Sequence, residues 1–568
     1  MTSVGAPLWI GRLVLAVFVL YVCAILAYQV SLMVDADYLH EEMRLLFRSY
    51  LLTDPDLFGD DYLTAFVGAF DQPLLYDWIT RLWLGAGGDL VVLHRLVPLI
   101  CWGVFLAGLA VAARRLGDRV TVIFVVGLAV AQPAYLYQIT SALPHSFAFP
   151  LLIWAFVALL HGSILGLAAL TVLSGLLYPA MAPLVGLLLA WRVVISKRIW
   201  RQDNAGRVRN LLLLAVTGAV AVWLLLGTLS GPADFGAPLE PMQDVDVYPE
   251  NGPEGRHFYG VFNPFTYVAA KAFVQFNDVF GKYKLLLLVI YGLFSIYGIW
   301  ALPRERGAAV AMLAMILCGL AVCLVVLALK PFHIYRFVLY PAFTVLPLLF
   351  VVGVREFCRK LLLGRGHPER ASAALLILFT VSLDGFDHQK VGYWWRLNPD
   401  SRAVVSFAQD QPPRTLFAIW PGSDEILELI PYLAKRPIFV MNKAHYPTYE
   451  GHIREMRART QALIAAYFAT EASALRALHC NWGVEFLVVE KAHFSGGDVR
   501  ATYFAPFDAQ IEEIWRRHRP EDFLLSNPDR RLVVLETESY AILKLSRSLG
   551  AADCEATATP KEPDRRSP

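Results

Sequence analysis

Residues 34–50 read VDADYLHEEMRLLFRSY and follow the first long apolar run of the chain. That run, Leu8–Val30, carries only Arg12 as a charge and is long enough to span a bilayer as a helix. Asp35 and Asp37 therefore lie near a membrane surface, where a carboxylate is costly to desolvate. The pair indicates a general base, or a metal-linked acid pair, that faces a lipid-borne substrate. The alternative is the solvated end of a helix.

The composition places the chain among membrane proteins. Of its 568 residues, 57% are hydrophobic and 17% are charged, which excludes a soluble globular protein and a disordered chain. The N-terminus has no small-residue cleavage site after a short apolar core, so we expect the first run to be retained. The seven cysteines show no metal-ligand spacing with nearby histidines, so neither a zinc site nor a disulfide framework is expected.

Further apolar runs alternate with short loops, and the basic residues are unevenly distributed among these loops. Four loops, 114–119, 192–209, 304–306 and 355–370, hold clusters of arginine and lysine, and the positive-inside rule places them in the cytoplasm. The chain must then cross the membrane an odd number of times between 146 and 192, and three short crossings fit; one crossing with a re-entrant segment is the alternative. The further runs are Val91–Ala113, Val120–Tyr137, Phe147–His161, Ile164–Leu177, Ala180–Trp191, Leu211–Leu229, Leu285–Leu302, Ala308–Leu329, Phe337–Val354 and Ala371–Leu383.

This pattern predicts an α-helical polytopic membrane protein with about eleven spans, a cytoplasmic N-terminus and a last span that ends outside. The transmembrane domain is expected over 1–390, with outer loops at 31–89 and 231–284. After it, 391–548 is expected to be a compact α/β domain outside the cytoplasm, and the polar tail 549–568 is expected to be disordered.

Within the C-terminal domain, short apolar runs that predict strands alternate with runs that predict helices. Strands are expected at Thr415–Trp420, Pro437–Met441, Phe486–Glu490, Leu532–Glu536 and Tyr540–Leu545, and helices at Asp424–Leu433, Tyr449–Ala469 and Phe507–Arg517. The domain contains neither a Gly-rich phosphate loop nor a G-x-S-x-G motif, so we assign it no catalysis and expect no nucleotide or nucleic-acid partner.

Unusual polar residues gather in the loops that are expected outside. The first outer loop includes DQPLLYDWITRLW (Asp71–Trp83), an amphipathic stretch that is expected to lie in the membrane interface. The second is long and rich in proline and glycine, which is typical of a functional or disordered loop. The residues expected to line a cavity or contact an acceptor are His40, Tyr76, His145, Arg256 and His257. A capping role is the alternative for His145.

A third outer loop, KPFHIYR (Lys330–Arg336), supplies positive charge. An arginine fork matches phosphate oxygens, and a lysine adds a point charge. Cations beside carboxylates at the outer surface suit a substrate with a phosphate at the lipid boundary and a sugar above it. The alternative for Arg336 is an interface anchor whose charged end snorkels into water.

Together these residues resemble the GT-C glycosyltransferases, polytopic enzymes that use polyprenyl-phosphate-linked sugars. Asp35-Ala36-Asp37 follows the first span, where this class keeps its catalytic carboxylate. DQPLLYDW (Asp71–Trp78) resembles the P-P-L-x-Y-x-W stretch of the protein O-mannosyltransferase and lipid A aminoarabinose transferase branch, with Gln72 in place of the first proline. The short middle spans and the outer C-terminal domain also match. The W-W-D-Y-G signature of oligosaccharyltransferases is absent, which disfavours transfer of an oligosaccharide to asparagine.

The resemblance implies an inner-membrane enzyme that moves a sugar, with inversion, from a polyprenyl-phosphate donor in the membrane lipid to an acceptor glycan, lipid or protein. Asp35 would be the general base, and Asp37 would orient the acceptor or hold a divalent cation (Mg²⁺ or Mn²⁺). Arg336, with Lys330 or His333, would neutralise the departing lipid phosphate. Residues at i and i+2 share no helix face, so both acids reach one cavity only if their turn is irregular. A flippase or transporter of lipid-linked glycans, and a non-catalytic assembly subunit, remain the alternatives.

Overall fold

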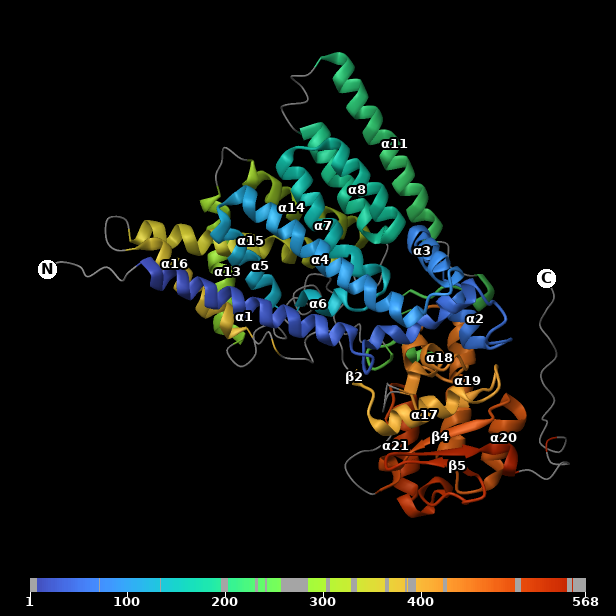
Figure 1. Ribbon diagram of the computed structural model, residues 1–568. Coiled ribbons are helices and arrows are strands. Elements are labelled where there is room, and N and C mark those ends of the chain that lie inside the picture. Colours follow the sequence, from blue (N-terminus) through green and yellow to red (C-terminus); the bar gives the residue numbers. More distant parts are fainter. Residues whose placement is uncertain are drawn as a thin grey trace. The chain divides into compact units, whose positions relative to one another are not determined.

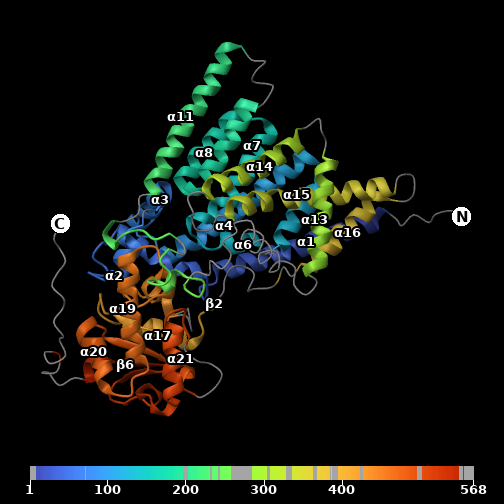
Figure 2. The ribbon, with the colours of Figure 1, turned by 180° about the vertical axis from the view of Figure 1, so that it is seen from behind.

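The computed structural model divides the chain into two compact units. The helical unit comprises Met1–His40, Gln72–Ser230 and Val261–Trp394, and the sheet unit comprises Glu41–Asp71, Gly231–Gly260 and Trp395–Pro568. Within them the structure describes residues 8–70, 72–132, 134–195, 203–229, 233–240, 243–256, 284–302, 307–327, 335–362, 367–383, 386, 395–421, 427–495, 502–548 and 554. Figures 1 and 2 show their elements from two sides.

The helical unit is built from the apolar runs of the sequence. Its helices are α1 (Leu8–Val34), α3 (Leu74–Gly85), α4 (Leu90–Leu116), α5 (Arg119–Ala131), α6 (Ala134–Ile139), α7 (Ala148–His161), α8 (Ile164–Leu177), α9 (Ala182–Ala190), α11 (Asn204–Leu229), α13 (Lys284–Ala301), α14 (Ala308–Leu327), α15 (Arg336–Leu361) and α16 (Pro368–Ser382). Local capping fixes several of their starts. The side chain of Asp89 accepts from Val92 N at 3.0 Å before α4, and that of Ser163 accepts from Gly166 N at 3.0 Å before α8.

Six helices in the described part of the chain are long and apolar enough to cross a membrane. They begin at Gly11, Leu90, Pro144, Asn204, Ala308 and Arg336, and shorter apolar helices lie at Arg119–Ala131, Ile164–Leu177, Pro179–Val194 and Leu286–Ala301. The predicted mainly helical fold is therefore confirmed. The predicted number of about eleven spans counts each short helix as a crossing, and it stays a prediction.

The apolar pattern suggested one helix over Val120–Tyr137, but this run does not form a single helix. It divides into α5 and the short α6, with Pro133 between them in the sequence. Proline lacks the N–H that a continuous helix would use at that point, so the break has a local cause. The result is a short helix whose polar backbone and side-chain groups are available to its neighbours, and the candidate site below depends on it.

Helices α13 and α15 lie side by side, as the view from behind shows (Figure 2). Two glycines allow the close approach. A Cβ atom at Gly353 would collide with the carbonyl oxygen of Phe294, and one at Gly298 would collide with that of Leu349. Small residues at such crossings let helix backbones pack closely, which is how helices associate in the absence of a strong hydrophobic drive.

The sheet unit holds a four-stranded sheet in the order β3-β4-β6-β5 (Figure 1). Its strands are β3 (Phe417–Ala418), β4 (Phe486–Glu490), β5 (Val533–Glu536) and β6 (Tyr540–Lys544). Strand β3 runs parallel to β4, whereas β6 runs antiparallel to both β4 and β5, with Phe486 opposite Lys544. The helices are α2 (Tyr62–Gly68), α17 (Pro399–Gln409), α18 (Ile430–Leu433), α19 (Glu450–Tyr467), α20 (Ala472–Trp482) and α21 (Phe507–Arg517).

The predicted α/β character of this region is confirmed, with differences in detail. Pro437–Met441 was expected to be a strand, but it forms only an isolated bridge between Ile438 and Phe417. Its neighbour β3 has two residues and offers too little backbone for a ladder. Helices α17 and α20 were not among the predicted elements.

The expectation of no disulfide is wrong, because Cys480 on α20 is bonded to Cys554, with their Cα atoms 5.3 Å apart. These two cysteines are 74 positions apart, so no local spacing could reveal the pair. Cys554 falls in the tail that was predicted to be disordered; the other residues of 549–568 lie outside the described part of the chain.

Two segments that were predicted to be outer loops contribute to the sheet unit. In Glu41–Asp71, the 3₁₀ helix η1 (Glu41–Leu52) places Arg44 in a buried ion pair with Glu428 at 2.5 Å. In Gly231–Gly260, the buried Glu250 accepts from Arg457 at 2.7 and 2.6 Å. Buried charges of this kind need partners, which ties both segments to the C-terminal region. The stretch 34–50 thus divides between the two units after His40.

Candidate functional site

Asp35 and Asp37 lie in a tight turn where α1 ends. The Asp35 N–H still donates to Ser31 O at 3.1 Å, and the Tyr38 N–H donates to Asp35 O at 3.2 Å, which closes the turn. Asp35 Oδ1 accepts from the Asp37 N–H at 2.9 Å. Both acidic residues are partly exposed. The turn is irregular, as joint use of the two acids requires, and it fixes one oxygen of the Asp35 carboxylate.

Arg95, on α4, binds the backbone of this turn through its guanidinium. Nη1 donates to the carbonyls of Met33 (3.3 Å) and Asp35, and Nη2 donates to those of Ala36 (3.1 Å) and Tyr38 (3.4 Å). The residue is only 8% exposed. Arg95 is not among the predicted site residues, because it lies inside the apolar run Val91–Ala113. An arginine in such a run is itself a signal, since an ionisable residue is expensive there unless it has a function.

Helix α6 joins the acidic turn to the start of α15. His40, at the end of the turn and 1% exposed, donates from Nε2 to Tyr137 O at 3.2 Å. The next residue on α6, Gln138, accepts from the Tyr340 hydroxyl at 2.7 Å through Oε1. Two consecutive residues of one short helix therefore contact the acid-bearing segment and α15.

Arg336, the first residue of α15, lies among tyrosines. Nη1 donates to the Tyr178 hydroxyl at 3.2 Å, and Nε is buried with no hydrogen-bond partner in the described part of the chain. Tyr340, one turn along the helix, is close enough to interact electrostatically with both Arg336 and Tyr178. His145 is buried, and its ring centroid lies 6.5 Å from that of Tyr178. Among the described residues, no carboxylate pairs with Arg336, so the cluster is an arginine in a cradle of hydroxyl groups.

Tyr76 and Arg256 make structural contacts of their own. The buried Tyr76 hydroxyl on α3 donates to Ala142 O at 2.6 Å, close in sequence to His145. Arg256 belongs to the sheet unit, where Nε donates to Asn442 O at 2.8 Å and the guanidinium lies 5.8 Å from the Tyr446 ring centroid. The remaining predicted site residues, Lys330, His333 and His257, lie outside the described residues.

The described residues contain no group of three or more His, Cys, Asp or Glu side chains arranged to hold a metal ion. Asp37 as a ligand of a divalent cation therefore stays a proposal.

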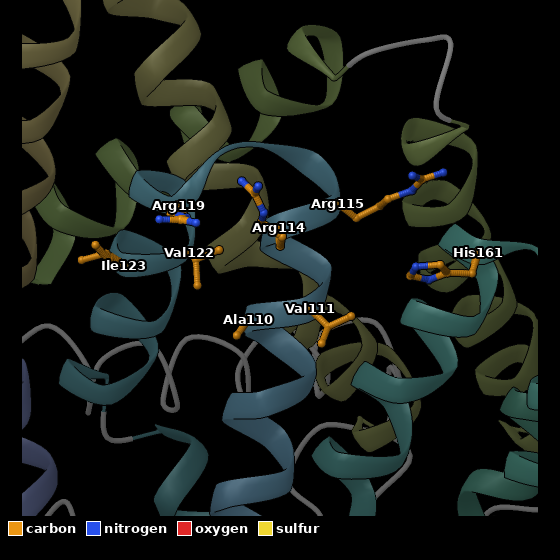
Figure 3. A pocket seen from close by; sticks show the side chains of 8 residues that line it. All are labelled: Ala110, Val111, Arg114, Arg115, Arg119, Val122, Ile123 and His161. Carbon is orange, nitrogen blue, oxygen red and sulfur yellow. The ribbon is translucent and has the colours of Figure 1, made fainter.

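A cavity of about 760 Å³ lies at the other end of α4 (Figure 3). It is lined by Ala110, Val111, Arg114, Arg115, Arg119, Val122, Ile123 and His161. With a rise of 1.5 Å per residue, Arg114 is roughly 28 Å along the helix axis from Arg95, about the thickness of a hydrocarbon core. The acidic turn and the basic cavity therefore mark opposite ends of one apolar helix.

No family model and no curated protein matches this sequence. Solved structures do match. The oligosaccharyltransferase of Archaeoglobus fulgidus in its apo form is 11% identical over 86% of this chain and 70% of its own, with a TM-score of 0.43. ArnT from Cupriavidus metallidurans is 14% identical over 96% and 99%, with a TM-score of 0.40. The mycobacterial arabinofuranosyltransferase AftD is 14% identical over 92% of this chain and 40% of its own, with a TM-score of 0.46.

These proteins are GT-C membrane glycosyltransferases. They are the class that the sequence resembles. Because the TM-scores lie below 0.5, the likeness assigns no donor, acceptor or site residue to this chain, and its function is argued from its own residues.

The geometry of the helical unit suits chemistry at a membrane surface. It offers a carboxylate with one oxygen fixed, at the end of an apolar helix, and a guanidinium among hydroxyl groups at the start of another. A short helix connects the two through hydrogen bonds. A carboxylate can take a proton from a hydroxyl group, and a guanidinium can hold a phosphate through two parallel N–H donors.

Proposed function

We propose that the protein is a membrane glycosyltransferase that moves a sugar from a polyprenyl-phosphate donor to an acceptor outside the cytoplasm, with inversion and with Asp35 as the general base. The observation that supports this most is the turn at the end of α1. The Asp37 N–H occupies one oxygen of the Asp35 carboxylate, which orients the group. The other oxygen can then accept the proton of an acceptor hydroxyl at the membrane surface.

The proposed reaction is a single displacement. The acceptor oxygen attacks the anomeric carbon of the donor sugar while its proton moves to Asp35. The bond between that carbon and the phosphate oxygen breaks, and its electron pair leaves with the polyprenyl phosphate. Attack opposite to the leaving group inverts the anomeric configuration. The protonated Asp35 then releases its proton to solvent, which restores the base.

Arg336 is the proposed partner of the leaving phosphate. Its charge has no carboxylate partner among the described residues, and Nε is buried without a hydrogen-bond partner. A phosphate oxygen would supply both the charge and the acceptor, and the Tyr178 hydroxyl is near enough to donate a further hydrogen bond. Lys330 and His333 precede Arg336 by a few residues and are proposed as additional phosphate ligands. Charge stabilisation of this kind is commonly the largest contribution to such a reaction.

The other predicted residues receive supporting roles. Asp37 is proposed to orient the acceptor or to hold a divalent cation, which would supply positive charge when bound. His40 and Tyr76 position the turn and the neighbouring loop through their backbone contacts. His145 is proposed to line a substrate cavity or contact the acceptor, beside Tyr178. Arg256 and His257, in the sheet unit's sequence, are proposed to contact the acceptor.

The proposed orientation has the acidic turn and the sheet unit outside the cytoplasm. The arginines of the cavity at 114–119 favour a cytoplasmic position by the positive-inside rule. The Cys480–Cys554 disulfide favours an oxidising compartment for the sheet unit.

The test uses the full-length protein in lipid nanodiscs with a panel of polyprenyl-phosphate sugars and candidate acceptors. Mass spectrometry follows the release of polyprenyl phosphate. Asp35→Asn keeps the size of the side chain and removes the base, so we expect the rate to fall by about 10²–10⁴-fold. Asp54→Asn changes an exposed carboxylate of the sheet unit and should retain the wild-type rate.

Two results would count against the proposal. Undiminished release by Asp35→Asn would remove Asp35 from the chemistry. Binding of the donor lipid without any release, from every donor tested, would favour a flippase or an assembly subunit. Repeating the assay with and without a chelator decides whether a divalent cation takes part.

A further inference from the structure

We propose that Arg95 is the positioning residue of the catalytic turn: its guanidinium fixes the backbone on which the Asp35 carboxylate is oriented. This inference rests on the proposed function, because it assigns a role in that reaction. It begins from the contacts. The two terminal nitrogens of Arg95 reach carbonyls on both sides of Asp35, from Met33 at the end of α1 to Tyr38 at the end of the turn.

The two sets of hydrogen bonds at the turn depend on each other. Arg95 binds the carbonyl of Asp35 itself, and the Asp35 side chain binds the N–H of Asp37. The carboxylate can keep its orientation only while the backbone of both residues stays in place. Since Arg95 also holds the carbonyl of the intervening Ala36, it fixes the peptide units that this orientation requires.

The charge of Arg95 also supports its positioning role. A guanidinium that is 8% exposed inside an apolar helix is costly, and an apolar side chain of similar size would pack there at lower cost. In the described part of the chain it forms no ion pair, and its donors go to backbone carbonyls. Its charge is therefore directed at a turn that carries two acids.

The connection to α6 extends the effect of Arg95. Tyr38, whose carbonyl Arg95 holds, is two residues before His40, which donates to Tyr137 on α6. A turn released from Arg95 would also loosen this contact. The distance between the base and the donor phosphate would then no longer be fixed, and a displacement of about 1 Å can cost roughly 100-fold in rate.

The experiment compares Arg95→Met, which removes both charge and donors, with Arg95→Lys, which keeps the charge and part of the hydrogen bonding. For Arg95→Met we expect kcat to fall about 100-fold while the KM for the donor stays near the wild-type value, since the donor contacts lie elsewhere. Arg95→Lys should recover about a tenth of the wild-type kcat. Gln29→Leu is the matched control. Gln29 is also buried and donates to a backbone carbonyl, that of Val130 at 2.8 Å, but it does not contact the turn.

A second readout does not depend on activity. Hydrogen–deuterium exchange of the peptide that covers 34–40 should become faster in Arg95→Met, while peptides from α5 and α15 exchange as in wild type. A purely structural role in the helical unit would instead speed exchange in those helices too, and would be matched by Gln29→Leu. Unchanged exchange at 34–40 would overturn the positioning role.

The two proposals can fail separately. If the wild-type protein transfers no sugar, the proposed function fails, and the exchange measurement still decides whether Arg95 fixes the turn. If the wild-type protein is active and Arg95→Met has an unchanged kcat, or a loss that lies in KM alone, the positioning role fails and the transferase stands.

Discussion

Arg336 brings a positive charge and several hydrogen-bond donors to the start of a helix. It begins α15, and its guanidinium donates to the Tyr178 hydroxyl, while Nε has no hydrogen-bond partner among the residues that the structure describes. A buried donor without an acceptor costs about 1–3 kcal/mol. A bound phosphate would remove this cost and would pair the charge. The guanidinium would therefore be more stable with the donor phosphate bound than without it, as a role in donor binding requires.

We predict that Arg336→Gln lowers kcat/KM for the donor by about 10- to 100-fold, because a hydrogen bond to a charged group contributes about 1.5–3 kcal/mol. Steady-state kinetics of polyprenyl-phosphate release, with donor concentration varied, measure the effect. Tyr178→Phe keeps the guanidinium and removes one hydrogen bond to a charged group, so it should cost about 10-fold, the lower end of that range.

The same helix offers the control for this prediction. Arg355, near the other end of α15, pairs with Asp118 at 2.6 Å and with Glu369 at 2.7 Å. Arg355→Gln makes the same chemical change on α15 and should leave kcat/KM for the donor unaltered. Equal kinetic losses in Arg336→Gln and Arg355→Gln would indicate damage to the helix and would refute the phosphate role.

At the scale of elements, the sheet unit depends on a histidine that must stay neutral. His452 on α19 is fully buried and stacks on Phe66 of α2, with ring centroids 3.4 Å apart. Nε2 donates to Ala444 O at 3.0 Å, and Nδ1 lies 3.2 Å from the Tyr62 hydroxyl, which can donate to it. Burial lowers the pKa of His452 to about 4, and the nearby Arg459 acts in the same direction.

The direction of the pH effect follows from that pKa. The folded state disfavours the protonated ring, so the stabilisation is complete above about pH 6.5 and is lost as the pH falls toward 4. At pH 5 the loss from His452 is about 2 kcal/mol. We predict that His452→Gln, which keeps a donor for Ala444, reduces the destabilisation between pH 7 and pH 5 by about this amount. Urea unfolding of the sheet unit, followed by tryptophan fluorescence of the full-length protein in nanodiscs, measures it.

His518 provides a comparison within the same unit, because it is partly exposed. His518→Gln should retain the wild-type difference between the two pH values. If His452→Gln also retains it, the acid sensitivity of the sheet unit has another origin.

The elements also show how far the sequence could lead. Apolar length and helix breakers suffice for α8, whose bounds match the predicted Ile164–Leu177, and for β4 and α21 in the sheet unit. The same reasoning merged α5 with α6, because a hydropathy pattern counts apolar residues and does not register a proline break. It also overlooked Arg95, since one charge hardly changes the average of a long apolar run.

Long-range pairing could not be predicted from patterns. Arg44 was read as part of a loop beside the first span, yet it pairs with Glu428, far along the chain. Cys480 and Cys554 gave no local signal for the same reason. The acid pair itself could be selected from its position after an apolar run, but the hydrogen bonds that orient it arise from α4 and α6, and these depend on tertiary packing.

At the scale of the whole molecule, the two ends of α4 decide how the chain is oriented across the membrane. Arg95, near its start, holds the acidic turn, and Arg114 and Arg115, near its end, line the basic cavity. A helix of this length and apolarity is able to cross a membrane, and a crossing would put the two features on opposite sides. Because basic residues favour the cytoplasmic side, we propose that the acidic turn lies outside, where it would meet a sugar acceptor of the cell envelope.

We predict that a membrane-impermeant maleimide labels Asp54→Cys in intact cells and labels Gly117→Cys only after the membrane is opened. Asp54 is exposed in the sheet unit, and Gly117 directly follows α4, in the turn that contains the clustered arginines.

The native disulfide offers an independent test of the orientation, because a cysteine pair stays oxidised outside the reducing cytoplasm. Protein from cells lysed in denaturant with an alkylating agent should therefore show five alkylated cysteines, namely Cys23, Cys101, Cys318, Cys323 and Cys358, and two more after reduction. Labelling of Gly117→Cys in intact cells, or Cys480 and Cys554 recovered as free thiols, would reverse the proposed orientation and place the acidic turn where no extracytoplasmic acceptor could reach it.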